Sequence, residues 1–448
     1  MKVYTAYPER IKECDTAFDA TAEWYRKAVD FFTDVIMENW QDISALPGRD
    51  KRVSAVERLT VRTPKRPEVP YDFGKDFYKF PSYLRRAAIA EALGKVSSYQ
   101  SLLDNWEKAD PKTRGKKPGY PKAGKTFPMM YRKGCYKETG DYTAEIKVFR
   151  NNTWDWTEVK LRKSDVDYIQ KHCCNRKECP PKLVKRGKKW SLVFSYEEEV
   201  TLTEKPPAEQ IIVAVDLGIN SACVCSVMKS DGTVVGRRFL QLPAENDSLE
   251  HKLGKIRRAQ KHGAKKMPAL WANVKGTNED ISVKTAQFII NVAHDCGADV
   301  IVMEKLDKRG KKRRSKKQRL HHWRSQYVQA MVVNKAHRLG MHISHVCARN
   351  TSRLAYDGSG KVLRGEEAEL KSHSMCKFQT GKVYNCDLNA TYNIGARYFI
   401  RELLKSLPET EKQGIEAKVP QCLKRSTCTL SDLISLNAVL ADSESDRY

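Results

Sequence analysis

The chain has 448 residues, more than one ordinary domain needs, so we expect two or three domains. It carries 81 Lys and Arg against 55 Asp and Glu, a net charge of +26, which favours a polyanionic partner because binding to phosphates releases counterions. Neither a run of about 20 apolar residues nor an N-terminal signal pattern is present, which excludes a membrane span and disfavours secretion. We therefore expect the 13 irregularly spaced cysteines to be reduced thiols or metal ligands in a cytosolic protein.

The first half combines helical and strand patterns. Residues 15–37 and 81–107 have the apolar spacing of helices, and Pro81 suits a first helical turn. Residues 110–126 are rich in Gly, Pro and Lys and predict a basic loop. From 140 to 202 apolar and polar residues alternate, which predicts a small barrel or sheet.

The second half has a different pattern, which opens with the apolar segment IIVAVD at 211–216. Asp231-Gly232 is a strong hairpin signal between two further strands. The expected elements are strands at 211–216, 221–230 and 232–240, helices at 249–275 and 282–296, a strand at 299–304, a helix at 322–339, a strand at 342–348 and a helix at 389–404. This order is typical of the ribonuclease H-like fold, a mixed five-stranded sheet flanked by helices. Residues 405–448 are less patterned and are treated as a C-terminal tail.

Three carboxylates occupy matching positions in this second half. Asp216 and Glu304 each end an apolar strand, and Asp387 comes just before the start of the last helix. The first and fourth strands of such a sheet are neighbours, so Asp216 and Glu304 should meet at one edge, with Asp387 facing them. Oxygen ligands of this kind suit Mg²⁺. Two ions about 3.5–4 Å apart can activate water and stabilise the leaving oxygen of a phosphodiester.

Each acid alone has an ordinary explanation: a strand-end aspartate, a partner for a following lysine, or an aspartate favoured by a helix dipole. The order and setting of all three together favour a magnesium-dependent nuclease.

The segments that carry these acids resemble a known family. VDLGIN, VMEKL and CDLNATYNIGARY look like the three split motifs of the RuvC-like nuclease domain. This version occurs in the TnpB family of transposon-encoded RNA-guided nucleases and in their descendants, the type V CRISPR effectors. ARNTSR at 348–353 resembles the segment that precedes the family's zinc-binding part. The resemblance is specific over about 211–400 and looser before it, in FPSYLRRAAI and KKPGYPKAGKTFPMMY.

The resemblance implies a multidomain α/β architecture. Residues 1–205 would form a wedge β-barrel with a helical recognition insertion at about 15–135, and residues 206–404 a RuvC-like nuclease domain. Asp216, Glu304 and Asp387 fall on the catalytic, magnesium-binding positions. Asn389 and Asn393 match polar positions of the third motif and are expected to support the helix rather than to bind metal.

The implied function is RNA-guided cleavage of DNA in the cytoplasm of a prokaryotic cell. The partners would be a guide RNA and a double-stranded target with its displaced single strand, and the role would be antiviral defence or transposon maintenance. Some small relatives pair two copies on one RNA, so a homodimer is one expected state.

The family's zinc-binding part is degenerate here, over residues 349–386. The first Cys-x-x-Cys pair is absent, and the second is reduced to Cys376 and Cys386, with His373 and Cys347 nearby. Because a structural zinc site needs four ligands and His373, Cys376 and Cys386 supply three, we favour a metal-free remnant over a zinc site.

Several basic runs predict nucleic-acid contacts. The run at 305–320 directly follows Glu304 and could act as a lid, although a solvated loop or a localisation signal would look the same. The candidate contacts are Lys311, Lys312, Arg313 and Arg314 in this lid, Arg257, Arg258, Lys265 and Lys266 in the basic segment 249–275, and Lys116, Lys117, Lys188 and Lys189 in the first half. Phosphate contacts position a strand without reading its sequence, which fits a protein that leaves sequence reading to a guide.

Other functions stay open at this point. An RNA-guided binder that does not cut need not keep three acids, and an unguided ribonuclease H-like nuclease or transposase does not need so large a basic N-terminal half. A non-enzymatic RNA-binding protein would not explain the three placed acids. Residues alone do not distinguish a CRISPR effector from a transposon nuclease.

Overall fold

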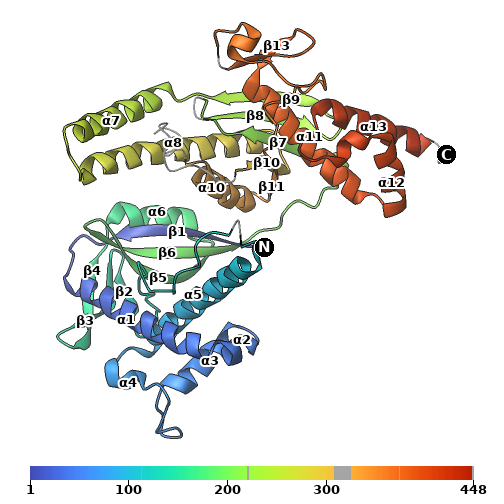
Figure 1. Cartoon of the computed structure of the whole chain (residues 1–448). Coiled ribbons are helices and arrows are strands. Elements are labelled where there is room, and N and C mark those ends of the chain that lie inside the picture. The colour runs from blue at the N-terminus through green and yellow to red at the C-terminus, as the bar shows by residue number, and fades with distance from the viewer. Residues whose placement is uncertain (112–113, 219–220, 307–323, 373, 446–448) are drawn as a thin grey trace. The chain divides into compact units, whose positions relative to one another are not determined.

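The computed structural model describes the chain apart from residues 112–113, 219–220, 307–323, 373 and 446–448. The chain divides into two compact units, residues 4–198 and residues 1–3 together with 199–448 (Figure 1). Both units combine helices with sheets, in agreement with the predicted α/β class.

After the first strand, β1, the described part of the first unit continues with five helices and ends mostly in strands. The elements are β1 (Lys2–Arg10), α1 (Ala17–Glu38), α2 (Trp40–Ala45), α3 (Arg49–Thr60), α4 (Phe73–Asp76), α5 (Ser82–Lys108), β2 (Tyr136–Gly140), β3 (Thr143–Arg150), β4 (Thr153–Lys160), α6 (Lys163–Cys173), β5 (Lys177–Arg186) and β6 (Lys189–Glu199). The helices predicted at 15–37 and 81–107 are α1 and α5, and the predicted strands include β3, β4 and β6.

The strands of the first unit form two three-stranded sheets, in the orders β1-β6-β5 and β2-β3-β4. An isolated bridge between Ile11 and Leu161 links the strand ends, and another joins Met129 to Lys182 of β5. The first bridge connects the two sheets locally, the second attaches the segment before β2 to β5, and a closed barrel stays a prediction.

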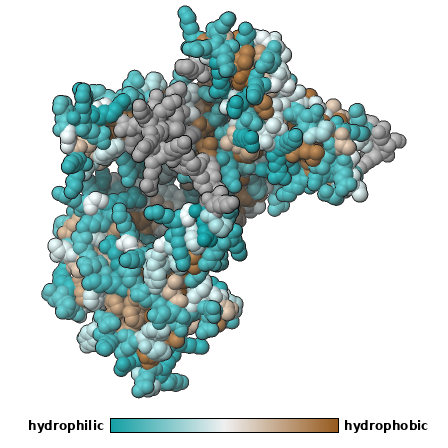
Figure 2. Space-filling model, in the orientation of Figure 1, coloured by the Kyte–Doolittle hydropathy of each residue, from teal (hydrophilic) through white to brown (hydrophobic). Residues whose placement is uncertain are grey.

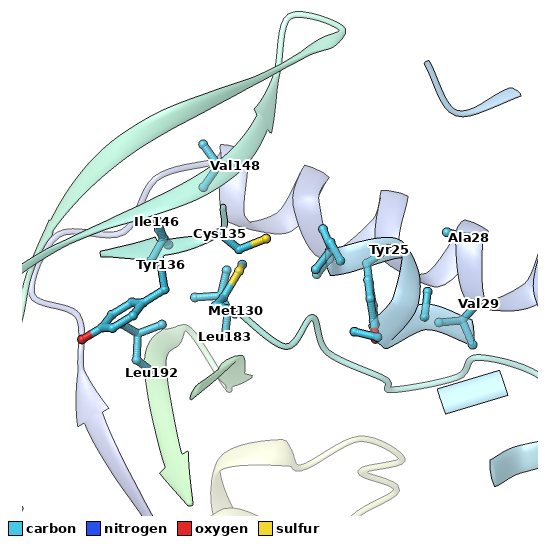
Figure 3. Close-up of a cluster of buried hydrophobic side chains, with 14 of the residues drawn as sticks. Tyr25, Ala28, Val29, Met130, Cys135, Tyr136, Ile146, Val148, Leu183 and Leu192 are labelled. Carbon is cyan, nitrogen blue, oxygen red and sulfur yellow. The ribbon is translucent and has the colours of Figure 1, made fainter. Parts of the chain in front are cut away.

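One apolar core holds the helices and strands of the first unit together. Figure 3 shows part of this core. The labelled residues are Tyr25, Ala28 and Val29 from α1, Met130 and Cys135 from the segment between α5 and β2, and Tyr136, Ile146, Val148, Leu183 and Leu192 from the strands. Burying each large apolar side chain contributes about 1.5–3 kcal/mol, so this shared core accounts for the compactness of the unit.

A buried acid lies near the edge of this core. Glu9 of β1 is 6% exposed, and burial, with repulsion from Glu178, Glu138 and Asp165, raises its pKa from 4.5 to about 7. The folded protein therefore binds a proton at Glu9 more tightly than the unfolded chain does. At a pH where Glu9 is ionised in both the folded and the unfolded state, its carboxylate disfavours folding.

The second unit contains the elements that were predicted for the nuclease half. They are β7 (Ile211–Asp216), β8 (Cys223–Lys229), β9 (Val234–Leu240), α7 (Pro243–Lys261), α8 (Pro268–Asp295), β10 (Val300–Lys305), α10 (Ser325–Arg338), β11 (His342–Cys347), β12 (Met375–Lys377), β13 (Val383–Asn385), α11 (Cys386–Ser406), α12 (Glu409–Lys418) and α13 (Leu430–Ser445).

A five-stranded sheet in the order β11-β10-β7-β8-β9 forms the centre of this unit. β10 runs parallel to β7 and β11, and β8 runs antiparallel to β7 and β9. The first and fourth strands are therefore neighbours, as predicted. Ile212 and Ala214 share a core with α11, whereas Val213 and Val215 share one with α8 and α10, because successive side chains of a strand point to opposite faces.

Two parts of this unit differ from the sequence expectation. The segment 249–275 is not one helix, because Gly263, with φ +83°, follows the end of α7 and Pro268 opens α8. α8 then continues through the separate helix expected at 282–296. The C-terminal tail is also structured: Leu433 and Leu436 of α13 are fully buried in the core that contains α11.

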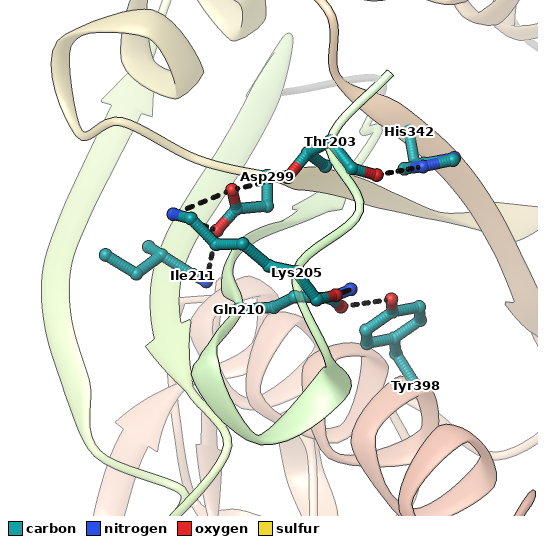
Figure 4. Close-up of polar contacts among 7 residues, drawn as sticks. All are labelled: Thr203, Lys205, Gln210, Ile211, Asp299, His342 and Tyr398. Carbon is teal, nitrogen blue, oxygen red and sulfur yellow. Dashed lines mark hydrogen bonds and ion pairs between the residues drawn. The ribbon is translucent and has the colours of Figure 1, made fainter. Parts of the chain in front are cut away.

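The segment that leads into β7 is attached to the sheet by one buried carboxylate, Asp299 (Figure 4). Its oxygens accept hydrogen bonds from the backbone N–H of Ile211 at 2.9 Å and from Thr203 Oγ1 at 3.2 Å, and Lys205 Nζ lies 3.0 Å away. His342 Nε2 lies 2.7 Å from the Thr203 carbonyl oxygen. Asp299 therefore connects the entering segment to the starts of β7 and β10.

We predict that Asp299→Ala lowers the free energy of unfolding by about 3 kcal/mol, because the change leaves Ile211 N–H and Lys205 without their acceptor. Asp299→Asn should cost less, since an amide oxygen can still accept from Ile211. Denaturant unfolding of the three proteins measures the difference. Equal stability of the alanine variant and the parent would contradict this role of Asp299.

For Glu9 we predict that Glu9→Gln matches the parent protein near pH 4.5 and exceeds it in stability at pH 8. A rise in pKa from 4.5 to about 7 corresponds to roughly 3 kcal/mol at most. Thermal unfolding as a function of pH tests this, with the exposed Glu107→Gln as the control. The gain should grow between pH 4.5 and 7, and a gain independent of pH would refute the assignment.

Candidate active site

Asp216 and Glu304 leave the sheet side by side. The parallel register pairs Ile212 with Val300 and Val215 with Met303, so the next residue of each strand is an acid. Ile212 and Ala214 of β7, and Val300 and Val302 of β10, belong to the core on the α11 side. Asp216 comes two residues after Ala214, and Glu304 comes two residues after Val302. Because every second side chain of a strand points to the same face, both carboxylates lie on the face that α11 covers.

Asp387 lies in the first turn of α11. The Asn385 side chain caps this helix by accepting from the backbone N–H groups of Asp387 and Leu388, each at 3.0 Å, which fixes where the helix starts. Further along, a Cβ at Gly395 would lie 2.9 Å from Met228 Sδ and 3.4 Å from Ala214 Cβ. Glycine therefore lets α11 approach β7 and β8 closely, and Asp387 is brought to the same face as the other two acids.

The pKa values show that the three acids share one environment. Burial first, and then repulsion from Glu304 and Asp387, raise the pKa of Asp216 well above its usual value. Burial also raises the pKa of Glu304 and that of Asp387. The structure thus brings the three predicted residues within electrostatic reach of one another. Positive charge nearby would stabilise their ionised forms by offsetting the mutual repulsion.

Thr351 orients Glu304. Its hydroxyl, in a side chain that is 2% exposed, donates to Glu304 Oε1 and lowers the pKa of that acid. The Asn393 side-chain amide of α11 donates to the Thr351 carbonyl oxygen at 2.9 Å and to the Leu354 carbonyl oxygen at 2.9 Å. The segment ARNTSR at 348–353, which contains Thr351, is therefore a structural link between α11 and Glu304.

Two more polar residues of α11 hold the same segment. Asn389, one turn before Asn393, donates to the Leu354 carbonyl oxygen and accepts from the Tyr356 N–H, both at 2.8 Å. Arg397, one turn after Asn393, donates to the carbonyl oxygens of Cys347, Arg349, Ser426 and Cys428 at 2.6–3.0 Å. Asn389 and Asn393 thus make structural hydrogen bonds rather than face the acids as ligands, as the sequence analysis expected.

Arg364 and Ser221 are site residues that the sequence analysis missed. The positive charge of Arg364 lowers the pKa of Asp216 and that of Asp387, and its Nη2 donates to the Ser352 carbonyl oxygen at 2.5 Å. The Ser221 side chain hydrogen-bonds to Asp387. Arg364 lies in the degenerate insertion, and a lone arginine there carries no pattern that could have revealed it.

The described residues contain no group of three or more Asp, Glu, His or Cys side chains arranged to hold a metal ion. The acids are thus neighbours without forming a preformed cage. The metal assignment of Asp216, Glu304 and Asp387 stays a prediction.

The zinc remnant contains two buried thiols in contact. Cys376 of β12 and Cys386 at the start of α11 are hydrogen-bonded to each other, which lowers the pKa of Cys386 and raises that of Cys376. They pack with Phe378 and Ala355 in a small apolar cluster. His373, the third candidate ligand, lies outside the described residues, so the preference for a metal-free remnant stays a prediction.

The predicted nucleic-acid contacts are exposed wherever the structure describes them. Arg257 and Arg258 lie on α7, and Arg257 pairs with Glu250 at 2.9 Å. The other exposed candidates are Lys265 and Lys266 between α7 and α8, Lys116 and Lys117 after α5, and Lys188 and Lys189 at the β5–β6 turn. The lid candidates Lys311, Lys312, Arg313 and Arg314 lie outside the described residues. The face in Figure 2 is largely hydrophilic.

Of the helices that the structure describes, none combines the length and the apolar character that crossing a bilayer requires.

Comparisons with known proteins agree with the motif resemblance. The Aq_aa04 family matches residues 5–150. The TnpB-like protein aq_aa05 of Aquifex aeolicus (strain VF5) is 27% identical over 238 residues, which cover 47% of this chain and 75% of the relative. The uncharacterized protein aq_aa04 of the same organism is 32% identical over 146 residues, 29% of this chain and 78% of the relative. Among solved structures, a Cas12f1–sgRNA–target DNA complex is similar at 15% identity and a TM-score of 0.34, covering 88% of this chain and 98% of that one.

We predict that Asp216→Asn stabilises the protein in metal-free buffer at neutral pH, because the change removes one of three repelling carboxylates. The gain should be about 1 kcal/mol, or roughly 2–4 °C in Tm. Thermal unfolding in the presence of a chelator measures it, with the exposed Asp247→Asn of α7 as the control. A loss of stability in Asp216→Asn would show that the carboxylate is needed by the fold.

Proposed function

Because this chain belongs to the TnpB-like family, and its N-terminal part to the Aq_aa04 family, we propose that it is an RNA-guided DNA endonuclease. In this proposal the second unit is a RuvC-like nuclease domain and the first unit holds the guide RNA. The enzyme would cut DNA that pairs with the guide, either as a compact type V CRISPR effector or as a TnpB-like transposon nuclease.

One observation carries the proposal: three carboxylates from distant parts of the chain share one face of a mixed sheet. Asp216 and Glu304 extend two parallel strands in register, and Asp387 lies in the first turn of the helix packed on that face. A protein that only bound nucleic acid would gain nothing from three acids that repel each other and the phosphates.

Asp216, Glu304 and Asp387 fit magnesium. They offer only hard oxygen ligands, which Mg²⁺ prefers. Burial raises the pKa of all three, although Arg364 acts against this at Asp216 and Asp387 and Arg397 at Glu304. Bound there, as two ions in this family's chemistry, magnesium would lower the pKa of water and neutralise charge on the scissile phosphate.

The residues around the acids supply orientation and charge. Thr351 holds the Glu304 carboxylate, Asn385 fixes the helix start that carries Asp387, and Ser221 hydrogen-bonds to Asp387. Arg364 is exposed and close enough to lower the pKa of two acids. We therefore expect Arg364 to contact a phosphate that approaches these acids.

The basic surfaces support binding to nucleic acid. Arg257, Arg258, Lys265 and Lys266 are exposed on and after α7 and would follow the backbone of a guide–target heteroduplex. A net charge of +26 favours both RNA and DNA through counterion release. The partners would be a guide RNA and a double-stranded target.

We predict that Asp216→Ala abolishes cleavage and leaves binding of guide RNA and target DNA within about twofold, because only the nuclease site loses a ligand. The experiment purifies the chain with co-expressed RNA, sequences that RNA, and measures plasmid cleavage with Mg²⁺. The exposed Asp247→Ala serves as the matched control and should cut like the parent.

The other functions are distinct outcomes of the same experiment. Discrete RNA with guide-dependent binding and no cutting by the parent would identify a binder. Cutting without any discrete RNA would identify an unguided nuclease. Cleavage retained in Asp216→Ala would remove this residue from the catalytic site.

A further inference from the structure

A second site lies in the first unit, far along the chain from the three acids. An open pocket of about 590 Å³ is lined by the end of α3, the short helix α4 and the first turn of α5. Its size is that of a small-molecule site, commonly about 300–1,000 Å³. All its lining residues belong to residues 60–85, so one compact stretch of chain builds it.

The rim of this cavity, the α4 pocket, is basic. Its described lining includes Arg62, Lys75, Lys79 and Arg85, with Asp72 as the acid among them. Asp72 is already engaged, because Arg62 Nη2 lies 2.7 Å from its Oδ2 and its Oδ1 accepts from the Gly74 N–H at 3.2 Å. Lys75 and Lys79 are exposed. Arg85 is also engaged, because its Nη2 lies 3.3 Å from Glu57 Oε1. An anionic group entering the pocket would therefore meet the positive charge of the two lysines.

The floor is apolar and rigid. Phe73, Phe77 and Phe80 line the pocket and are 2–7% exposed. The Phe73 and Phe77 rings stack with centroids 4.5 Å apart, and Phe80 meets both edge-on at 5.4 and 5.9 Å. Offset-stacked and edge-to-face pairs of this kind are favourable arrangements of aromatic rings, so the three phenylalanines hold one another at the base of the pocket.

A strained turn presents an aromatic ring and a cation at the rim. The Phe80 N–H donates to the Phe77 carbonyl oxygen at 3.3 Å, and Lys79 inside this turn has φ +55°, a left-handed conformation that non-glycine residues seldom adopt. Backbone strain of this kind, of order 1 kcal/mol, often marks ligand sites. Tyr78 is 66% exposed, with Lys79 Nζ 5.1 Å from its ring centroid.

We propose that the α4 pocket binds one unpaired nucleotide of a single-stranded nucleic acid. The base stacks on Tyr78, the exposed residue between the lining residues Phe77 and Lys79, and the adjoining phosphates contact Lys75, Lys79 and Arg62. Stacking on an exposed ring beside a basic groove is the usual means of holding single strands. A duplex keeps its bases stacked inside and cannot offer one to Tyr78. This proposal concerns binding alone and does not depend on cleavage.

Photocrosslinking of the purified full chain tests the proposal. The probes are a 12-nucleotide RNA with one 4-thiouridine, a 12-nucleotide DNA with one 4-thiothymidine, and the fully paired duplex of each. Crosslinked peptides are mapped by mass spectrometry. The test variants are Tyr78→Ala and the double variant Lys75→Asn with Lys79→Asn, in which asparagine tolerates the left-handed backbone. The charge-matched control is Lys12→Asn with Lys171→Asn, two exposed lysines of the same unit.

We expect single strands to label the peptide that contains residues 71–85. Labelling should fall at least about fivefold in both test variants and less than twofold in the control, because two phosphate contacts or one stacked base are lost. The RNA and DNA arms identify which strand is preferred. Absence of label from 71–85, equal loss in the control, or equal labelling by duplexes would overturn the proposal. Because no cutting is measured, failure of the endonuclease proposal would leave this result unaffected.

Discussion

The parallel pairing of β7 with β10 is the constraint on which the second unit depends. Val215 opposite Met303 means that Asp216 and Glu304 follow at the same level, on the face that α11 covers. Carboxylates placed this way repel each other, and burial strengthens the repulsion. They stay together because apolar side chains on both faces of the sheet fix the strands. The packed core thus stabilises an arrangement that the acids alone would oppose.

α11 connects that core to the chemistry. Its apolar residues cover the sheet, and Gly395 allows close contact. Its polar residues Asn389, Asn393 and Arg397, spaced four apart, are each less than 5% exposed. They satisfy the backbone of the segment after β11 and, through Thr351, orient Glu304. Buried polar groups require such partners, so the helix and this segment hold each other in place.

In its described residues, the first unit is held together by one apolar core and not by a central sheet with apolar side chains on both faces. This core joins helices and two small sheets. The α4 pocket shows this at small scale, with packed phenylalanines beneath a basic rim. Glu9 is a buried acid with a raised pKa, so its ionisation weakens the fold at neutral pH and above.

The sequence by itself determined the strands and helices with strong periodicity, the two acids at strand ends and the one near the start of a helix. Short-range patterns carry this information, because apolar alternation and helix caps act on neighbouring residues. It missed the break at Gly263 and Pro268, the structured tail, Arg364 and the α4 pocket. Arg364 reaches Asp387 from a loop, and Leu433 reaches α11 from a weakly patterned segment. Such contacts form only when distant segments pack together, so tertiary structure alone decided them.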